Sequence, residues 1–335
     1  MTLLLDNADV RSVLRMRDAI DALDAAFVDY ADGVAVNRPR SHTYTHRGGA
    51  RHYLFKTMDG SVPRLGVQAL RLSSDLTDES GGKRIKIPAA PGDRYVGLVL
   101  LFDLETLAPV AILHDGYLQR VRVGATSALA ASKLARKDSG VVGMLGAGWQ
   151  AGPQIEGLRE VLDVEEVRVY APTREKLEAF AAEHDATAVD SAREAIEGAD
   201  VVVLATNSQQ PVLDGAWLAP GTHVNSVQRH ELDARTLARA ELVVVRSREE
   251  PTFHYAPGHA PRAARDRRLE DVVELGDVLK GLAGRTRDDQ ITLFTGGGGL
   301  GIQFAAVAHA VYAAARDAGA GRDLPTEWFT QEEKP

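Results

Sequence analysis

Hydrophobic and polar positions follow two different patterns along the chain. In the middle, short apolar runs alternate with segments of helical periodicity, and such runs are typical of parallel strands buried on both faces. We expect strands at residues 141–145, 167–170, 201–206, 222–227 and 242–245, and helices at 150–162 and 175–184. This alternation predicts a doubly wound Rossmann domain.

The flanking segments have a different pattern. Residues 16–30 have the periodicity of an amphipathic helix, and strand-like pieces follow at 42–45, 52–55, 65–72 and 95–103. Turns containing glycine and proline join these pieces, which favours an antiparallel sheet. Alanine-rich segments at 125–136 and 302–318 predict two more helices, the second packing back on the N-terminal part. The expected fold class is α/β, with a Rossmann domain at 122–301 inserted into an α+β domain formed by 1–121 and 302–335.

Composition narrows the classes of function. The formal net charge is -8 and the pI is about 5.7, which disfavours nucleic acid and anionic membrane surfaces as partners. The chain has no cysteine, so disulfides, zinc–thiolate sites and a cysteine nucleophile are excluded, and we expect no metal. Because Asp6 follows three leucines and no apolar run approaches ~20 residues, we expect neither a signal peptide nor a membrane span, and a cytoplasmic protein.

A glycine-rich turn is the sharpest local signal. Gly146, Gly148 and Ala151 form a G-x-G-x-x-A pattern after a predicted strand and before a predicted helix. The first glycine permits a tight turn, the second lets a pyrophosphate approach the backbone, and the helix N-terminus supplies amide donors. The turn therefore predicts a dinucleotide site, with contacts expected from Gly146, Ala147, Gly148, Trp149 and Gln150. The alternative is a glycine turn in a nucleotide-free α/β domain.

The end of the second Rossmann strand bears on which dinucleotide binds. NAD enzymes usually carry an acidic residue there for the ribose 2′-hydroxyl, but this chain has Thr173 and Arg174. These two residues favour NADP over NAD, unless Arg174 simply opens the next helix on a solvated face. Thr206, Asn207 and Val227 end the following strands and are expected to contact the nicotinamide half.

Several collinear stretches between residues 38 and 325 resemble the ornithine cyclodeaminase/μ-crystallin family. They are LQRVRVGATSALA at 118–130, LARKDS at 134–139, LFD at 101–103, ATNS at 205–208, PVL at 211–213, GTHVN at 221–225 and the glycine turn ending at Gln150. The resemblance implies a homodimer in which the N-terminal domain, closed by the C-terminal helix, forms the dimer interface and part of the substrate pocket. It also implies hydride exchange at the carbon of a C–N bond next to a carboxylate.

That chemistry needs a guanidinium for the carboxylate and an acid–base group for the nitrogen. Arg122 matches the arginine of the family's R-T-A-A-like motif and is expected to hold the carboxylate. Arg40 is the expected match for an early arginine of the family, with Arg38 as its competitor. Arg71 stands where the family usually has a lysine; it can bind a carboxylate, but its high pKa makes it a poor proton donor.

The sequence departs from the cyclodeaminases at the acid–base position. The family's G-x-D-x-P-G aspartate is missing, which leaves His230 and Glu231 as candidates for the catalytic acid–base role, beside Arg71. Lys83 or Lys86 could replace the missing lysine, although a solvated turn charge is the simpler interpretation of both. The glycine run at 296–299 is expected to let the backbone approach the cofactor. Residues 42–55 and 328–329 are candidates for lining the pocket.

Three functions remain open at this stage. The first is an NAD(P)-dependent imine or ketimine reductase, or amino-acid dehydrogenase, that acts on a small carboxylated amino or imino acid. The second is an amino-acid cyclodeaminase, which releases ammonia and recycles the hydride on bound cofactor. The third is a non-catalytic, NADP-bound binding protein of μ-crystallin type, since both the lysine and the aspartate are replaced.

Overall fold

The computed structural model describes residues 1–80, 85–248, 252–254, 272–296 and 298–333. Within these residues, one mainly antiparallel sheet has the strand order β15-β3-β4-β5-β7-β8-β1-β18, with β2 paired to β4 and β6 to β5. Its strands are β1 (Thr2–Leu5), β2 (Val36–Asn37), β3 (Ser41–His46), β4 (Arg51–Val62), β5 (Val67–Asp78), β6 (Ile85–Ile87), β7 (Val96–Asp103), β8 (Pro109–His114), β15 (Thr252–His254) and β18 (Arg322–Leu324).

The inner face of this sheet follows from alternation along the strands. In β5 every second residue from Val67 to Thr77 is buried, as expected of a strand with one face against a core. The buried face changes character along the strand: Val67 and Ala69 are apolar, whereas the next inward residues, beginning with Arg71, are polar or charged. One sheet therefore contributes both to the core and to a polar site.

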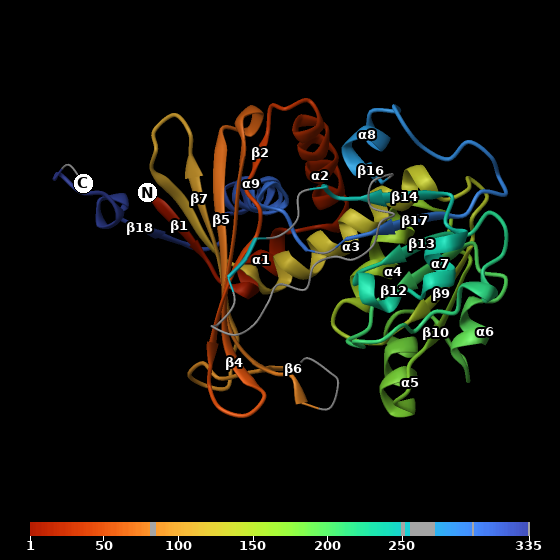
Figure 1. Cartoon of the computed structure of the whole chain (residues 1–335). Coiled ribbons are helices and arrows are strands. Elements are labelled where there is room, and N and C mark those ends of the chain that lie inside the picture. The colour runs from red at the N-terminus through yellow and green to blue at the C-terminus, as the bar shows by residue number, and fades with distance from the viewer. Residues whose placement is uncertain (81–84, 249–251, 255–271, 297, 334–335) are drawn as a thin grey trace.

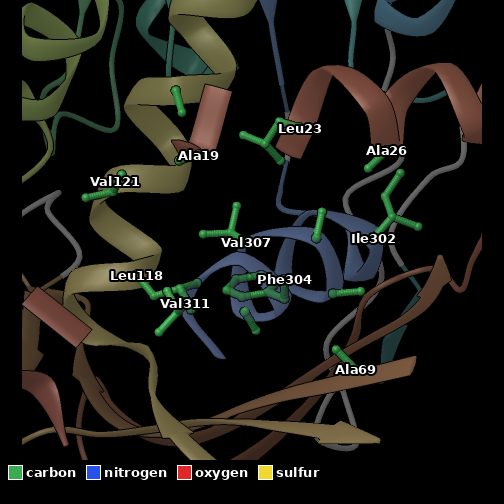
Figure 2. Close-up of a cluster of buried hydrophobic side chains, with 14 of the residues drawn as sticks. Ala19, Leu23, Ala26, Ala69, Leu118, Val121, Ile302, Phe304, Val307 and Val311 are labelled. Atoms are coloured by element: carbon green, nitrogen blue, oxygen red, sulfur yellow. The ribbon is translucent and has the colours of Figure 1, made fainter. Parts of the chain in front are cut away.

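Helices cover the apolar part of that face (Figure 1). They are α1 (Asn7–Val13), α2 (Met16–Ala31), α3 (Asp115–Leu134) and α9 (Gly301–Ala318). Figure 2 shows side chains from α2, α3, α9 and β5 meeting around Phe304, Val307 and Leu118, which are fully buried. Because burying a large apolar side chain contributes about 1.5–3 kcal/mol, this cluster fixes α9 against the first sheet, as the sequence predicts for residues 302–318.

The second sheet is parallel throughout and has the order β11-β10-β9-β12-β13-β17-β14-β16. Its strands are β9 (Val141–Leu145), β10 (Glu166–Tyr170), β11 (Thr187–Ala188), β12 (Val201–Leu204), β13 (His223–Ser226), β14 (Leu242–Val245), β16 (Val273–Glu274) and β17 (Thr292–Thr295). The strand order reverses between β9 and β12, which is the switch point at which doubly wound sheets bind ligands.

Both faces of the second sheet are covered. The helices of this part are α4 (Ala151–Val161), α5 (Arg174–Glu183), α6 (Ala192–Ile196), α7 (Ala234–Arg239) and α8 (Leu275–Leu279). Met144 of β9 packs in a cluster with Ile155 of α4, while the next residue, Leu145, packs in a separate cluster with Ile196 of α6. Burial on both faces explains the unbroken apolar runs in the sequence, and the predicted Rossmann fold class is confirmed.

The long helix α3 joins the two parts (Figure 1). His114 caps its N-terminus, because the ring Nδ1 accepts from the backbone N–H of Gly116 at 3.0 Å. The helix begins ten residues before the predicted start at 125, so the proposed boundary at 121/122 falls inside it. Strand β15 also pairs with β3 of the first sheet, although it lies within the range assigned to the Rossmann domain.

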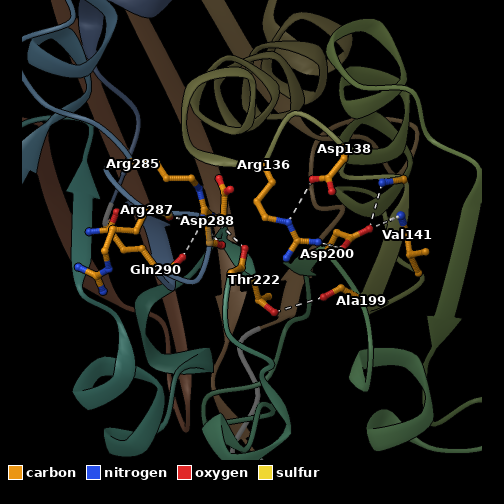
Figure 3. Close-up of polar contacts among 12 residues, drawn as sticks. Arg136, Asp138, Val141, Ala199, Asp200, Thr222, Arg285, Arg287, Asp288 and Gln290 are labelled. Atoms are coloured by element: carbon orange, nitrogen blue, oxygen red, sulfur yellow. Dashed lines mark hydrogen bonds and ion pairs between the residues drawn. The ribbon is translucent and has the colours of Figure 1, made fainter.

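Charged side chains hold the amino ends of the Rossmann strands together (Figure 3). Arg136 pairs with Asp200 at 2.5 Å, and the second oxygen of Asp200 accepts from the backbone N–H groups of Gly140 and Val141, each at 3.0 Å. Arg285 donates to the carbonyl groups of three segments, those of Leu134, Gly221 and Gln290. This network fixes the edge opposite to the expected cofactor site.

Candidate active site

The glycine turn has the shape that a dinucleotide requires. Gly146 has φ of +113°, and a Cβ there would lie 2.4 Å from the carbonyl oxygen of Ala205. A Cβ on Gly148 would meet no atom within 4 Å, so the backbone at Gly148 faces open space at the start of α4. An open glycine turn before a helix N-terminus suits a pyrophosphate, and the residues present therefore fit the dinucleotide.

Two predicted cofactor residues lie at the rim of this turn. Trp149 is 54% exposed, and the guanidinium carbon of Arg120 lies 4.8 Å from the centre of its ring. The side-chain amide of Gln150 donates to Gln119 on α3 at 3.0 Å. Ala147 packs at the edge of the cluster beneath the turn. The turn is thereby tied to α3, the helix that also carries Arg122.

Glu231, predicted as an acid–base candidate, has both carboxylate oxygens bound by protein donors. It is fully buried in the short 3-10 helix η4 (Arg229–Glu231). One carboxylate oxygen accepts from the backbone N–H and the hydroxyl of Thr206, at 2.7 and 2.6 Å, and the other from the backbone N–H of Gln228 at 2.9 Å. Burial raises the pKa of Glu231. Since both oxygens are occupied by protein donors, Glu231 fastens the ends of β12 and β13 and is not placed to exchange a proton with substrate.

The other residues predicted at this edge follow the two strands. Val227 donates its backbone N–H to the carbonyl of Leu204 at 3.0 Å, which joins β13 to β12, and Asn207 is exposed just after β12. His230 is partly buried in η4, beside Glu231. His230 therefore lies at the carboxyl edge of the sheet, on the cofactor side.

Thr173 and Arg174 lie where a ribose of the dinucleotide is expected, at the start of α5. Both are exposed. The Arg174 guanidinium pairs with Glu178 and with Asp190, each at 2.6 Å. Two carboxylates on one guanidinium leave the local charge negative, so a 2′-phosphate would have to displace them. This pairing weakens the argument for NADP.

Arg122 is buried in the middle of α3. Its Nη1 donates to Oε1 of Gln303 on α9 at 3.3 Å, and its guanidinium carbon lies 4.8 Å from the ring centre of Phe304. Burial is the main cause that lowers the pKa of Arg122, and the nearby guanidinium groups of Arg246, Arg71 and Arg40 add to it. Arg122 forms no ion pair with a carboxylate within the described part of the chain.

Arg71 lies on β5 and also contacts the ring of Phe304. Its guanidinium carbon is 5.4 Å from the ring centre of Phe304, and its Nε pairs with Asp115 at 2.6 Å. Arg71 and Asp115 are both buried. The structure thus brings Arg71 and Arg122 to one aromatic ring, but the charge of Arg71 is already neutralised by a carboxylate.

Two more arginines complete the cluster. Arg40, the expected match for the family's early arginine, is half-buried, whereas its competitor Arg38 is 68% exposed and pairs with Asp59 at 2.8 Å. Arg246, which the sequence analysis did not single out, follows β14 and is buried; its Nη1 donates to the carbonyl of Gly298 at 2.8 Å. Burial lowers the pKa of Arg246 to about 10, so it is a cation at neutral pH.

The glycine run before α9 contacts these arginines. A Cβ on Gly296 would lie 2.2 Å from Arg246, one on Gly298 would lie 2.6 Å from Arg40, and one on Gly299 would lie 2.6 Å from Arg122. A side chain at any of these positions would require the facing guanidinium group to move. The described glycines of this run pack against the guanidinium groups, and their expected approach to the cofactor stays a prediction.

A half-buried lysine on β4 was given no role from the sequence. Lys56 on β4 pairs with Asp75 of β5 at 3.2 Å, and Lys86 pairs with the other oxygen of Asp75 at 2.9 Å. The strand register places Lys56 opposite Ser73, two residues along β5 from Arg71 and on the same face. Burial, reinforced by the charge of Lys86, lowers the pKa of Lys56 to about 7. Alternation along β4 was the available signal, because Lys56 shares a face with the buried Leu54 and Met58.

Other predicted residues are placed elsewhere. Trp328 and Phe329 are exposed in a 3-10 helix, η6 (Thr326–Phe329), beside β8, which is two strands from β5 in the first sheet. Lys83 lies outside the described residues. No cluster of three metal-binding side chains occurs among those described, and no described helix is long and apolar enough to cross a membrane.

A cavity of about 780 Å³ opens at the amino edge of the Rossmann sheet, between Arg136 and Arg287. Its arginines are already occupied, since Arg136 pairs with Asp200 and Arg287 with Glu241. Doubly wound sheets bind ligands at the opposite, carboxyl edge. We therefore place the active site at the glycine turn and the arginine cluster, not at this cavity.

A Rossmann sheet with an open glycine turn, together with a buried cluster of guanidinium groups, defines an NAD(P)-dependent oxidoreductase. The profile of the ornithine cyclodeaminase/mu-crystallin family matches residues 1–319, and the chain belongs to this family. It is 31% identical over 321 residues to the alanine dehydrogenase of Archaeoglobus fulgidus, which covers 93% of this chain and 94% of that protein.

Solved structures agree with this assignment. The structure of Thermococcus litoralis Δ1-pyrroline-2-carboxylate reductase, in complex with NADH and L-proline, matches with a TM-score of 0.77 and 27% identity, covering 96% of this chain and all of that one. An archaeal alanine dehydrogenase dimer with bound NAD matches with a TM-score of 0.79 and 29% identity, covering 97% and 99%. The predictions of the family, the fold class and NAD(P) dependence are confirmed.

Proposed function

We propose that this NAD(P)-dependent enzyme exchanges hydride at a C–N bond next to a carboxylate, working as an imino-acid reductase or, in reverse, as an amino-acid dehydrogenase. In the reductive direction, an imino acid, NAD(P)H and one proton give an amino acid and NAD(P)+. The hydride for the carbon would come from the nicotinamide of a dinucleotide held at the glycine turn. The observation that carries this proposal is Arg122, a buried guanidinium that forms no ion pair with a carboxylate among the described residues, on the helix to which the dinucleotide turn is tied through Gln119 and Gln150.

Arg122 is the clamp for the substrate carboxylate. A buried cation without a counter-ion is costly, and a substrate carboxylate would remove that cost with a charge-assisted hydrogen bond. Gln303 accepts from one Nη of Arg122 and donates to Thr126 Oγ1 at 2.7 Å, which fixes the orientation of the guanidinium. Arg71 orients the same pocket through Phe304 while its charge is balanced by Asp115.

Lys56 is the acid–base group that we propose for the substrate nitrogen. It occupies the inner face of the first sheet next to Arg71, and only 16% of its side chain is exposed. An amine that titrates near neutral pH can both donate and accept a proton at the operating pH, a task that a guanidinium cannot perform. His230, at the cofactor edge, is the remaining candidate of the two predicted from the sequence.

The cofactor preference and the assembly are part of the proposal. We expect the preference for NADP over NAD to be weaker than the sequence suggests, because the guanidinium of Arg174 is already paired with Glu178 and Asp190. Replacement of Arg174 by alanine should then change KM for NADPH by less than about threefold; a larger rise would reinstate the 2′-phosphate site. The likeness to the archaeal alanine dehydrogenase dimer supports a homodimer, which light scattering of the purified protein would test.

The test of function is a spectrophotometric screen with NADH and NADPH. It covers cyclic imines and 2-oxo acids with ammonia or methylamine, with ammonia release from ornithine and lysine followed in parallel. We expect consumption of reduced cofactor with an imino acid, and a fall in kcat/KM of at least about 100-fold on Arg122→Met, the cost of losing a charge-assisted pair. Arg38→Met is the matched control, because Arg38 is an exposed arginine that pairs with Asp59.

The alternatives give different results in the same screen. Ammonia release without net change in cofactor would identify a cyclodeaminase. Cofactor binding with no turnover across the panel would favour a binding protein. Equal losses in the Arg122 and Arg38 variants would refute the role of Arg122 as a clamp.

A further inference from the structure

The arginine cluster carries more positive charge than one substrate carboxylate would balance. Arg71 is neutralised by Asp115, but neither Arg122 nor Arg246 forms an ion pair with a carboxylate among the residues that the structure describes. Both are buried, at 4% and 5% exposure. The Nε atoms of both are also buried without a hydrogen-bond partner. Two uncompensated guanidinium groups in one buried site indicate that bound ligand supplies negative charge to each.

The two guanidinium groups occupy different places along the glycine run. Arg122 packs against Gly299, whereas Arg246 packs against Gly296 and donates to the carbonyl of Gly298. Arg40 packs against Gly298, on the Arg246 side. Gly299 comes three residues after Gly296 and one after Gly298, so the two positions are offset by one to three residues of chain, with successive Cα atoms about 3.8 Å apart. A short ligand with an acidic group at each end matches that offset.

The phosphates of the dinucleotide are not the missing anions. The pyrophosphate site is the turn after β9, and Arg246 follows β14. In the sheet order β9-β12-β13-β17-β14, these strands are separated by four steps, or about 19 Å at 4.8 Å per step. A 2′-phosphate would lie beyond β9 on the far side, near β10. The Arg246 end of the cluster therefore belongs to the substrate part of the site.

We propose that the substrate is a dicarboxylic imino or amino acid, with Arg122 holding the carboxylate next to the C–N bond and Arg246, supported by Arg40, holding the side-chain carboxylate. This inference rests on the proposed function and adds the substrate class to it. Arg246 is the specificity-determining residue, since no other described element brings an unpaired cation to that end of the glycine run.

Two other arrangements make different predictions. Arg246 and Arg122 could share a single carboxylate, in which case removal of Arg246 weakens all substrates alike. Arg246 could also act only as a brace for the glycine run, through the Gly298 carbonyl and its position 5.7 Å from the Phe294 ring centre. A brace too would affect all substrates alike. The ratio between substrates with one and two carboxylates therefore separates the proposal from both.

The experiment measures kcat/KM for oxaloacetate and 2-oxoglutarate against pyruvate and 2-oxobutyrate, each with ammonia and reduced cofactor. We expect the wild-type enzyme to prefer the dicarboxylic acids, and Arg246→Met to lower the dicarboxylate-to-monocarboxylate ratio by about 10- to 100-fold, the effect of one charged hydrogen-bonded contact. Arg246→Lys should recover part of the ratio. Arg38→Met should leave it unchanged. A wild-type preference for monocarboxylates, or an unchanged ratio in Arg246→Met, would overturn the proposal.

A binding measurement keeps this inference separable from the proposed reaction. If no imine consumes cofactor, the reductase proposal fails, but titration of the NAD+-bound protein with succinate and with butyrate still tests the second carboxylate site. Tighter binding of succinate, lost in Arg246→Met, would support the site by itself. Equal binding of the two acids would refute it.

Discussion

Lys56 and Lys86 share the carboxylate of Asp75, so the pKa of Lys56 depends on Lys86, a residue with no proposed chemical role. Lys56 and Lys86 bind opposite oxygens of Asp75, at 3.2 and 2.9 Å, and the charge of Lys86 disfavours the charged form of Lys56. Arg71 lowers the pKa of Lys56 in the same way, and His42 lies opposite Lys56 on β3. Removal of Lys86 should raise the pKa of Lys56 from its value of about 7.

The size of the effect follows from Coulomb's law. Two unit charges on the order of 6 Å apart, at an effective dielectric constant of about 20, interact by about 2.8 kcal/mol, which equals about 2 pH units. The Lys86 side chain is 47% exposed, and solvent screening reduces the expected change to about one unit. The loss of Lys86 also leaves Asp75 to Lys56 alone, which acts in the same direction.

The assay is the pH dependence of kcat/KM for imine reduction. The reductive step needs Lys56 protonated, so kcat/KM of the wild-type enzyme should fall as pH rises through about 7. In Lys86→Met the fall should move up by about one unit, making the variant about fivefold faster than wild type at pH 8. Lys133→Met, at an exposed lysine near the end of α3, is the control without a shift.

Three outcomes bear on this reasoning. If the fall of kcat/KM with pH occurs at the same or a lower pH in Lys86→Met, the electrostatic coupling between the two lysines is refuted. If Lys56→Met keeps the wild-type rate and the same pH dependence, Lys56 is not the acid–base group, and His230 is the remaining candidate. If Lys56→Met loses imine reduction but keeps its affinity for the cofactor, the result supports Lys56 as the proton donor to the substrate nitrogen.

Two further predictions concern the cofactor edge. Gly148→Val should keep the wild-type melting temperature, because a Cβ there meets no atom within 4 Å. It should nevertheless lower NAD(P)H affinity at least about 100-fold by filling the pyrophosphate space. Gly146→Val should lower the melting temperature as well, because its Cβ would lie 2.4 Å from the Ala205 carbonyl oxygen. Equal melting temperatures for the two variants, or full cofactor affinity in Gly148→Val, would contradict this. Glu231→Gln should cost about 1–3 kcal/mol of stability by placing an amide donor against a backbone or hydroxyl donor, measured by denaturant unfolding, and a stability equal to wild type would show that the strand ends do not depend on that carboxylate.

Local pattern determined much of this protein. The apolar runs at 141–145 and 242–245 coincide with β9 and β14, because strands buried on both faces leave a clear sequence signature. The glycine turn was equally legible, since its φ of +113° at Gly146 and the helix after it are local properties. Arg122 could be proposed from its motif alone. The start of α3 was missed by ten residues, because its first two turns contain Gly116 and several polar residues that interrupt the apolar pattern.

The completeness and the charge of the site were decided only by tertiary structure. Glu231 resembled a catalytic acid in the sequence. The hydrogen bonds that Thr206 and Gln228 donate to its carboxylate depend on β12 and β13 ending side by side. Arg246 and Lys56 had no motif, and their burial follows from the glycine run and from the pairing of β4 with β5. Whether a charged residue is paired depends on residues distant in sequence, such as Asp115 for Arg71. Sequence pattern records the period of local structure, whereas the balance of buried charge is a property of contacts between elements.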